Sequence, residues 1–443
     1  MASDLLSIAA SGARAARSAL DVTAQNIANA SSEGYVRRSV RMEEVSSAGG
    51  LLRSNDISLS GVRISGIHRN ADMFRQAELR RTNSDVTRAE AELRGLQNVE
   101  SAIEQAGVYP AIVEFEAALQ QLTSNPTDSS LRAAAMASAD TLARKFNIAA
   151  GSLDAVGEGL RFEADAAVGE ANIIGSELAR VNLRLARAGD GSSDQASLLD
   201  QRDALLERLS GIVDISTSFA VDGGVMVSAG GQTFVTGGAS GVLSMATLTD
   251  GTLAFEINGA SITPAGGSLA GSALALTETA NTRARLDTLA DGIAATVNTV
   301  QANGSAIDGT AGQPLFAGTG ASGMRLAITS GDALATAPAG APAGSLDGSN
   351  LAALRQALDA SGAASGMNNL LFDVSSQVAG RTVTYEALDA IAASARISLE
   401  QQAGVDLDTE AANLMRFQQA FQASGRAMQV ASDIFNTLMG IGR

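Results

Sequence analysis

Few side chains of this 443-residue chain stand in patterns that could do chemistry. His68 is the single histidine and cysteine is absent, so a nucleophilic triad of the Ser–His type and a thiolate metal site both lack an essential member. The segment Gly318–Gly323 reads GTGASG, which matches the dinucleotide-binding spacing G-x-G-x-x-G. That fingerprint needs a following helix, whereas the next residues, Met324–Thr329, alternate like a strand. We therefore expect no nucleotide site there.

Two groups of charged residues resemble sites but have simpler explanations. The acidic residues of Asp406–Glu410 are spaced like the start of a calcium loop, but the glycine and the remaining ligands do not follow. We interpret them as residues that favour the N-terminal end of a helix. Asp200, Arg202 and Asp203 lie on a predicted helix, where we expect a surface ion pair worth well under about 1 kcal/mol. No catalytic, metal or cofactor-binding residue is predicted, and the chain is not expected to be an enzyme.

The charge balance disfavours two classes of partner. The chain has 31 Lys and Arg against 47 Asp and Glu, for a formal net charge of −16. Nucleic acids and anionic membranes both attract clustered cations, so we expect no nucleic-acid partner and no membrane partner. The sequence has no apolar run long enough to span a bilayer, and its first ten residues lack the features of a cleaved signal peptide.

The strongest pattern is a seven-residue apolar repeat in the last 40 residues, 404–443. Its main series is Leu407, Leu414, Phe421, Met428 and Phe435, and its companion series is Phe417, Ala431 and Leu438. Two apolar positions per seven form a narrow seam, which is stable only when another helix covers it. We expect one helix of about 30 residues that is built to pair.

The first 29 residues repeat in the same way. The series is Leu6, Ala13, Leu20 and Ile27, flanked by further alanines. Because alanine lets another backbone approach closely, the large Phe and Met side chains of the C-terminal helix should fit there. We expect the chain ends to form one parallel or antiparallel pair, with everything else inserted between them. The alternative is two ordinary core helices of a globular domain. An exposed apolar seam favours unwanted association. We therefore expect the termini to be mobile or covered in the monomer, and to become ordered when neighbouring subunits supply a partner surface.

The middle of the chain predicts a mainly α fold with an inserted all-β domain. Residues 40–68 alternate like short strands, and long helical patterns follow, including Ser129–Ala188. Residues 212–276 have paired glycines, alternating apolar residues and almost no charge, which is typical of short strands and tight turns. A helix is expected at Glu278–Asn303. The predicted domains are a terminal coiled coil (1–40 and 404–443), a long-helix bundle with short strands (41–211 and 277–403) and a small outer β domain (212–276).

The stretch Ala19–Arg38 carries a specific resemblance. It reads ALDVTAQNIANASSEGYVRR and is similar to the N-terminal signature of bacterial flagellar axial proteins, which are the rod, hook and hook-associated subunits. The signature residues are Asn26, Asn29, Gly34 and Tyr35. We interpret the two asparagines as helix-capping and turn residues that shape an assembly surface.

Three further stretches narrow the resemblance to the hook-associated protein 1 family. They are Leu122–Asn147, Leu198–Leu206 (LLDQRDALL) and Glu410–Gly440, and they occur in the order of that family. The resemblance covers both ends and much of the first half of the chain, while the β region carries no family motif. A hook or rod subunit is the first alternative, but it should lack the long internal helices and LLDQRDALL. A secreted coiled-coil effector would need a long apolar hairpin, which the sequence does not contain.

The resemblance implies a structural component that joins the flagellar hook to the filament. It implies a homo-oligomeric ring, contacts with the hook protein and with adjacent hook-associated or filament subunits, and terminal helices that line a central channel. It also implies export to the extracellular flagellum through the flagellar type III apparatus, without a cleaved signal peptide, and an export chaperone that holds the C-terminal helix. No cofactor is implied.

Overall fold

The computed structural model describes residues 2–32, 34–44 and 61–441, and these residues are mainly helical. The helices are α1 Ala2–Ala28, α2 Met73–Ala106, α3 Val108–Ser124, α4 Ser129–Leu185, α5 Ser193–Ile212, α6 Gly267–Ala302, α7 Gly320–Gly323, α8 Ser349–Ser361, α9 Ala363–Ala403 and α10 Leu407–Ile441. The strands are β1 Arg38–Glu44, β2 Val62–Arg69, β3 Ser216–Phe219, β4 Val225–Ala229, β5 Gln232–Thr236, β6 Ala239–Ser240, β7 Leu243–Thr247, β8 Leu253–Ile257, β9 Ala260–Ile262, β10 Gly304–Ser305, β11 Phe316–Ala317, β12 Arg325–Leu326 and β13 Ala337–Pro338. None of the described helices could cross a bilayer.

The chain divides into two compact units. Unit 1 contains Met1–Ser84, Glu170–Leu243 and Asp389–Arg443, and unit 2 contains Asp85–Gly169 and Ser244–Leu388. The mainly helical class agrees with the sequence, whereas the predicted division into three domains remains a prediction.

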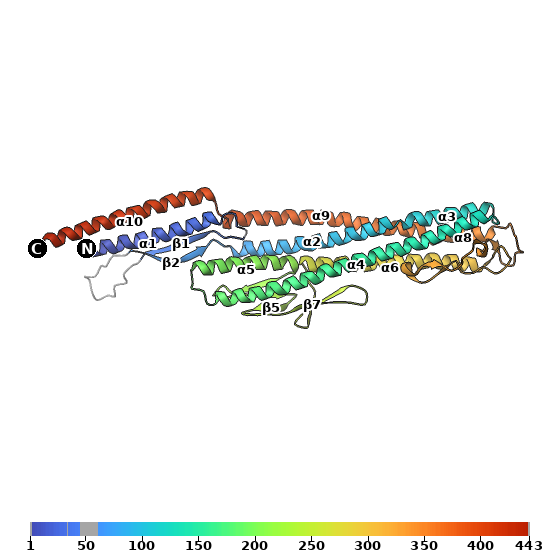
Figure 1. The fold of residues 1–443 in the computed structure, drawn as a ribbon, viewed down its shortest axis with the longest axis horizontal. Coiled ribbons are helices and arrows are strands. Elements are labelled where there is room, and N and C mark those ends of the chain that lie inside the picture. The colour runs from blue at the N-terminus through green and yellow to red at the C-terminus, as the bar shows by residue number, and fades with distance from the viewer. Residues whose placement is uncertain (1, 33, 45–60, 442–443) are drawn as a thin grey trace. The chain divides into compact units, whose positions relative to one another are not determined.

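The two terminal helices of unit 1 lie side by side and run antiparallel (Figure 1). Asn26, near the end of α1, donates a hydrogen bond to Glu410, in the first turn of α10. Further along, a Cβ atom on Gly12 would lie 3.9 Å from the Cβ of Ser424. Residue numbers thus rise along α1 as they fall along α10, which settles the orientation that the sequence left open. In the single chain each terminal helix covers one face of the other.

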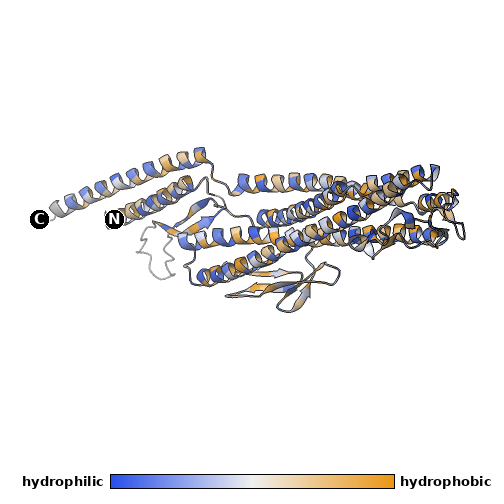
Figure 2. Ribbon diagram, turned by 45° about the vertical axis from the view of Figure 1, so that its right-hand side comes forward, coloured by the Kyte–Doolittle hydropathy of each residue, from blue (hydrophilic) through white to orange (hydrophobic). Residues whose placement is uncertain are grey.

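The faces that meet differ from those predicted. On α1 the alanines form the buried face, whereas Leu6 and Ile27 are 43% and 37% exposed. The buried face of α1 comprises Ala9, Ala13, Ala15, Ala16, Ala19, Val22, Thr23 and Asn26. Leu20, also in the predicted series, is half-buried. Hydrophobic and hydrophilic residues alternate along both helices (Figure 2).

On α10 the buried and partly buried side chains come from both predicted series and from positions between them. Glu410 and Ala431 are buried and Phe417 and Ser424 are partly buried. In the main series Leu414 and Met428 are partly buried. Exposed fractions are 54% for Leu407, 43% for Phe421 and 49% for Phe435. In the single chain Phe421 and Phe435 are thus not buried between the alanines of α1, where we expected the large Phe and Met side chains to fit. The side chain of Leu438 lies outside the described residues.

A short hairpin follows the first helix. Strands β1 and β2 pair antiparallel, with a bulge between Arg41 and Met42, as expected for residues 40–68. The predicted strand residues between 45 and 60 lie outside the described part of the chain. The Ile67 N–H donates to the carbonyl of Gly191 at 2.7 Å, which ties the hairpin to the loop before α5. A Cβ on Gly191 would approach the Cα of Gly66 to 2.9 Å, so the two glycines permit this contact.

The predicted β stretch contains strands β3 to β9. In unit 1, β3-β4-β5-β6 form an antiparallel sheet on a core of Val225, Val227, Phe234 and Val235. The Asn182 amide of α4 holds this sheet because its Nδ2 donates to the carbonyls of Val225 and Gly237. Strands β7-β8-β9 form a second sheet.

Helix α6 begins at Gly267, eleven residues before the predicted start at Glu278. The extra turns are rich in Gly, Ala and Ser, whose small side chains resemble a loop in the sequence. A Cβ on Gly271 would lie 2.3 Å from the Arg88 carbonyl oxygen, so α6 packs directly against the backbone of α2 there.

Unit 2 has a single large core built mainly from helices. Phe115 of α3 packs edge to face on Phe316, with ring centroids 6.0 Å apart. The fully buried Arg132 donates to the carbonyls of Pro126, Gly331 and Leu334 and to the Thr336 hydroxyl. These bonds join the start of α4 to the loop before β13.

The segment Gly318–Gly323 lies between the paired strands β11 and β12. It contains only the four-residue helix α7. A dinucleotide fingerprint would instead stand between a parallel strand and a long helix, so the structure agrees with the interpretation made from the sequence.

Candidate assembly site

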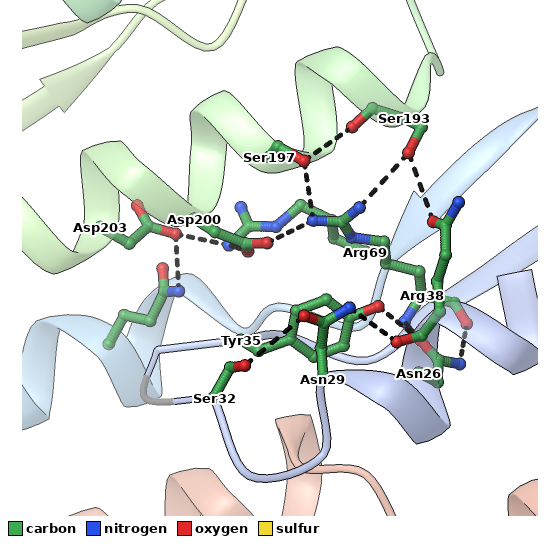
Figure 3. Close-up of polar contacts among 12 residues, drawn as sticks. Asn26, Asn29, Ser32, Tyr35, Arg38, Arg69, Ser193, Ser197, Asp200 and Asp203 are labelled. Atoms are coloured by element: carbon green, nitrogen blue, oxygen red, sulfur yellow. Dashed lines mark hydrogen bonds and ion pairs between the residues drawn. The ribbon is translucent and has the colours of Figure 1, made fainter.

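A buried polar cluster joins the terminal helices to the β1–β2 hairpin and to α5, all within unit 1. Figure 3 shows its contacts between α1, the hairpin and α5. Its first member, Asn26, is 1% exposed in the last turn of α1. The Asn26 Nδ2 donates to the Arg38 carbonyl at 2.8 Å and to Glu410 Oε2 at 3.1 Å. Its Oδ1 accepts from the Tyr35 hydroxyl at 2.9 Å and from the Arg38 N–H at 3.0 Å. Asn26 is therefore a cross-link between three segments, which goes beyond the capping role predicted for it.

Glu410 fixes the start of α10. Its carboxylate is 1% exposed and also accepts a hydrogen bond from the Arg37 Nε at 2.7 Å. The backbone N–H of Arg37 donates to the Ala403 carbonyl at 2.8 Å, at the end of α9. The loop after α1 thus holds both sides of the short connection between α9 and α10.

The turn between α1 and β1 carries the other signature residues. Gly34 has φ +73°, a left-handed conformation that favours glycine. The Asn29 amide donates to the Gln25 carbonyl at 2.9 Å, which agrees with a turn-forming role. The Arg38 guanidinium lies 4.9 Å from the centre of the Tyr35 ring. Burial raises the pKa of the Tyr35 hydroxyl; Arg38 opposes this effect, while Asp200 and Glu410 add to it.

Helix α5 supplies two carboxylates that bind the hairpin arginines. Asp200 pairs with Arg38 at 2.6 Å and with Arg69 at 2.7 Å. Asp203 pairs with Arg69 at 2.9 Å and with Arg202 at 2.6 Å. The exposed side-chain fractions run from 6% to 15%. Burial alone would raise the pKa of the Asp203 carboxyl, but Arg202 and Arg69 outweigh burial and hold the pKa below its usual range.

The expectation of a surface ion pair at Asp200, Arg202 and Asp203 is thus wrong. The hairpin covers this face of α5 and brings Arg38 and Arg69 against it, from more than 130 positions away in the sequence. A local sequence pattern cannot reveal such partners. The one available signal was the pair of arginines, Arg37 and Arg38, which follows the GY of the family signature after one residue, Val36.

The cluster is suited to holding segments together. Each of its three carboxylates has an arginine partner within 2.7 Å. Among the described residues no group of three or more His, Cys, Asp or Glu could hold a metal ion. His68 is exposed on β2, outside the cluster.

Comparisons with known proteins first define the class. Residues 6–35 match the family model described as flagella basal body rod protein, and residues 400–441 match the C-terminal model of flagellar basal body rod proteins FlgEFG. The two matched segments contain most of the paired helices α1 and α10, so the terminal pair is the part that the chain has in common with flagellar rod-type proteins.

The chain belongs to the flagellar hook-associated protein FlgK family, whose helical-domain model matches residues 93–316. It is similar to flagellar hook-associated protein 1 of Bacillus subtilis, with 24% identity over 97% of this chain and 96% of that protein. The Salmonella typhimurium protein of that name is 29% identical over 53% of this chain and 43% of its own length. The solved structure of the flagellar hook junction protein FlgK from Burkholderia pseudomallei has a TM-score of 0.50 and 25% identity, covering 54% of this chain and 46% of that one.

The family decides between the alternatives left by the sequence. The helical-domain match is to a hook-associated family model, which favours this family over a hook or rod subunit. The chain is a hook-associated structural protein of the bacterial flagellum, and its relatives are structural flagellar proteins, not enzymes.

Proposed function

We propose that the chain is a junction subunit that joins the flagellar hook to the filament and assembles through the outward faces of α1 and α10. The observation that carries the proposal is the exposure of large apolar side chains at multiples of seven residues along α10: Leu407, Phe421 and Phe435. Burying one such side chain stabilises a contact by about 1.5–3 kcal/mol. Apolar residues at this spacing are suited to pairing with another helix.

The proposed occupant of this surface is the terminal pair of a second copy. α1 contributes Leu5, Leu6 and Ile27, which are 51%, 43% and 37% exposed. Because α1 and α10 already cover one face of each other, only their remaining faces can take up neighbours. Repeating the same contact from copy to copy would close a ring, as a heterologous interface does when its rotation closes.

A junction subunit contacts other flagellar proteins on two sides. We place the hook protein on one side of the ring and adjacent hook-associated or filament subunits on the other, with the terminal helices around a central channel. The chain would reach this extracellular position through the flagellar export apparatus. Before export, a chaperone that holds α10 would cover the same apolar residues and prevent premature association.

A charge placed on the proposed surface tests the assembly role. Phe421→Asp with Phe435→Asp should abolish swimming and remove the protein from purified flagella, because the carboxylates cannot be buried against a neighbouring helix. The matched control is Phe162→Asp in α4 of unit 2, where the phenylalanine is 77% exposed. Motility and flagellar content at wild-type levels in the double variant would contradict the proposal.

The chaperone is tested separately by co-purification from the cytoplasm of an export-deficient strain. The double variant should lose a small partner protein that co-purifies with the unchanged chain, whereas Phe162→Asp should retain it. Equal recovery of that partner with both variants would argue against chaperone binding on this face.

A further inference from the structure

The rotation of α10 about its own axis leaves three of its large apolar side chains, Leu407, Phe421 and Phe435, exposed. Its most apolar series is the main one, with Leu, Leu, Phe, Met and Phe at successive positions. The inward series of α10, whose side chains are buried or partly buried, includes Glu410, Leu414, Phe417, Ser424, Met428 and Ala431. Positions three residues apart on a helix of 3.6 residues per turn lie about 60° apart around the axis. A roll of about 60° would therefore bring Phe421 to the position around the axis that Ser424 now has.

Glu410 is the one side chain of this inward series that makes charged contacts. Its carboxylate is held from two sides, by Arg37 at 2.7 Å and by Asn26 at 3.1 Å. Both partners are themselves held in place. Asn26 forms hydrogen bonds with Arg38 and Tyr35, and the backbone N–H of Arg37 donates to the carbonyl of Ala403. Rolling α10 by about 60° would withdraw the carboxylate from both donors and leave a buried charge unpaired.

We propose that Glu410 is the positioning residue that sets the rotation of α10, so that Phe421 and Phe435 stay exposed. Buried polar residues play a comparable part in coiled coils, where a single one selects among alternative packings at a cost in stability. The inference concerns a single chain and does not rest on the role in the flagellar junction.

The absence of tryptophan from the chain provides a selective probe. Phe421→Trp introduces one fluorophore at a position that is 43% exposed. In this background the indole emission should be that of a partly solvated side chain and should be quenched by acrylamide. Adding Glu410→Leu should shift the emission to shorter wavelength and remove the quenching, because the roll buries residue 421 against the alanines of α1.

The absence of cysteine provides a second, independent readout. A Cβ on Gly12 lies 3.9 Å from the Ser424 Cβ, close to the mean of about 3.8 Å found in disulfides. The pair Gly12→Cys and Ser424→Cys should therefore cross-link under mild oxidation in the otherwise unchanged chain. Adding Glu410→Leu should reduce the cross-link to background.

Two control variants separate the position of the carboxylate from its charge. Glu410→Gln keeps the shape and a carbonyl acceptor, so it should retain the emission and the cross-link of the parent. Asp408→Leu removes an exposed acid from the same first turn and should also change neither readout.

Each combination of results decides the question. Burial of the introduced indole together with loss of the cross-link in Glu410→Leu supports the proposal. Unchanged readouts would mean that small residues such as Ala431 set the rotation, and loss of the cross-link with a still exposed indole would mean that α10 has detached. Either of these results, or a buried indole with the cross-link retained, overturns the assignment.

Discussion

At the scale of single residues, the buried cluster contains ion pairs that a local sequence pattern does not reveal. Asp200 and Asp203 appear in the sequence as surface charges, yet both are buried against Arg38 and Arg69 from the hairpin. Removing one partner from such a cluster leaves a buried charge less compensated, which costs far more than breaking an exposed pair.

Arg69→Leu should lower the free energy of unfolding by about 3 kcal/mol, because Asp200 and Asp203 each lose one of two cations. Urea unfolding followed by circular dichroism measures this change. The control is Arg75→Leu, which removes an exposed pair with Glu78 and should change stability by less than about 0.5 kcal/mol. Equal effects of the two variants would show that the cluster contributes no more than a surface pair.

The lowered pKa of Asp203 makes part of the stability dependent on pH. The folded state binds the proton less tightly than the unfolded chain, whose carboxyl has a pKa of about 3.9. The stabilisation is thus present above about pH 4 and is lost as the pH falls toward the lowered pKa of the folded state. Asp203→Asn should flatten the dependence of the urea midpoint on pH over this acidic range, and an unchanged dependence in this variant would contradict the account.

At the scale of elements, the sequence predicted where helices occur better than which faces they bury. Seven-residue repeats identified both terminal helices, because the repeat depends only on the chain itself. The rotation of α10 depends on Glu410, Arg37 and Asn26, and this contact spans more than 370 positions. The early start of α6 was missed because its first turns are rich in small residues, whose helical role appears only in close packing.

The glycines of α6 provide a test of that packing. Gly271→Ala should destabilise unit 2 by about 1–3 kcal/mol, because the new Cβ would lie 2.3 Å from the Arg88 carbonyl oxygen. Gly292→Ala, in the same helix, meets no atom within 4 Å and should stabilise the helix by up to about 1 kcal/mol. Thermal unfolding of the two variants measures both effects, and changes of the same sign would contradict the packing account.

At the scale of the whole molecule, the sequence indicated that both chain ends belong to one structural part. Unit 1 indeed contains both terminal helices together with residues 170–243. The four family-like stretches lie in or close to helices, where patterns are longest and easiest to compare. The β segment contains no motif of the family. The sequence predicted the region in which its strands lie, but not where each strand begins and ends.

Removing one terminal helix should therefore expose the other. Deletion of residues 407–443 uncovers the alanine face of α1, so trypsin should cut rapidly at Arg14 and Arg17. Mass spectrometry of the tryptic fragments measures this cleavage. The full-length Phe421→Asp chain should remain protected at both arginines. Continued protection in the deleted chain would show that α1 is held without α10.

The hydrogen bond between Asn26 and Glu410 joins residues 384 positions apart, and this separation has a consequence in time. At about 5–20 residues per second, a ribosome completes α10 some 20–80 s after α1 has been made. During that interval the alanine face of α1 has no partner in its own chain. Helix α1 is thus the first to be synthesised but among the last to be covered by its partner helix. The rate of translation sets the time during which another chain could occupy its alanine face.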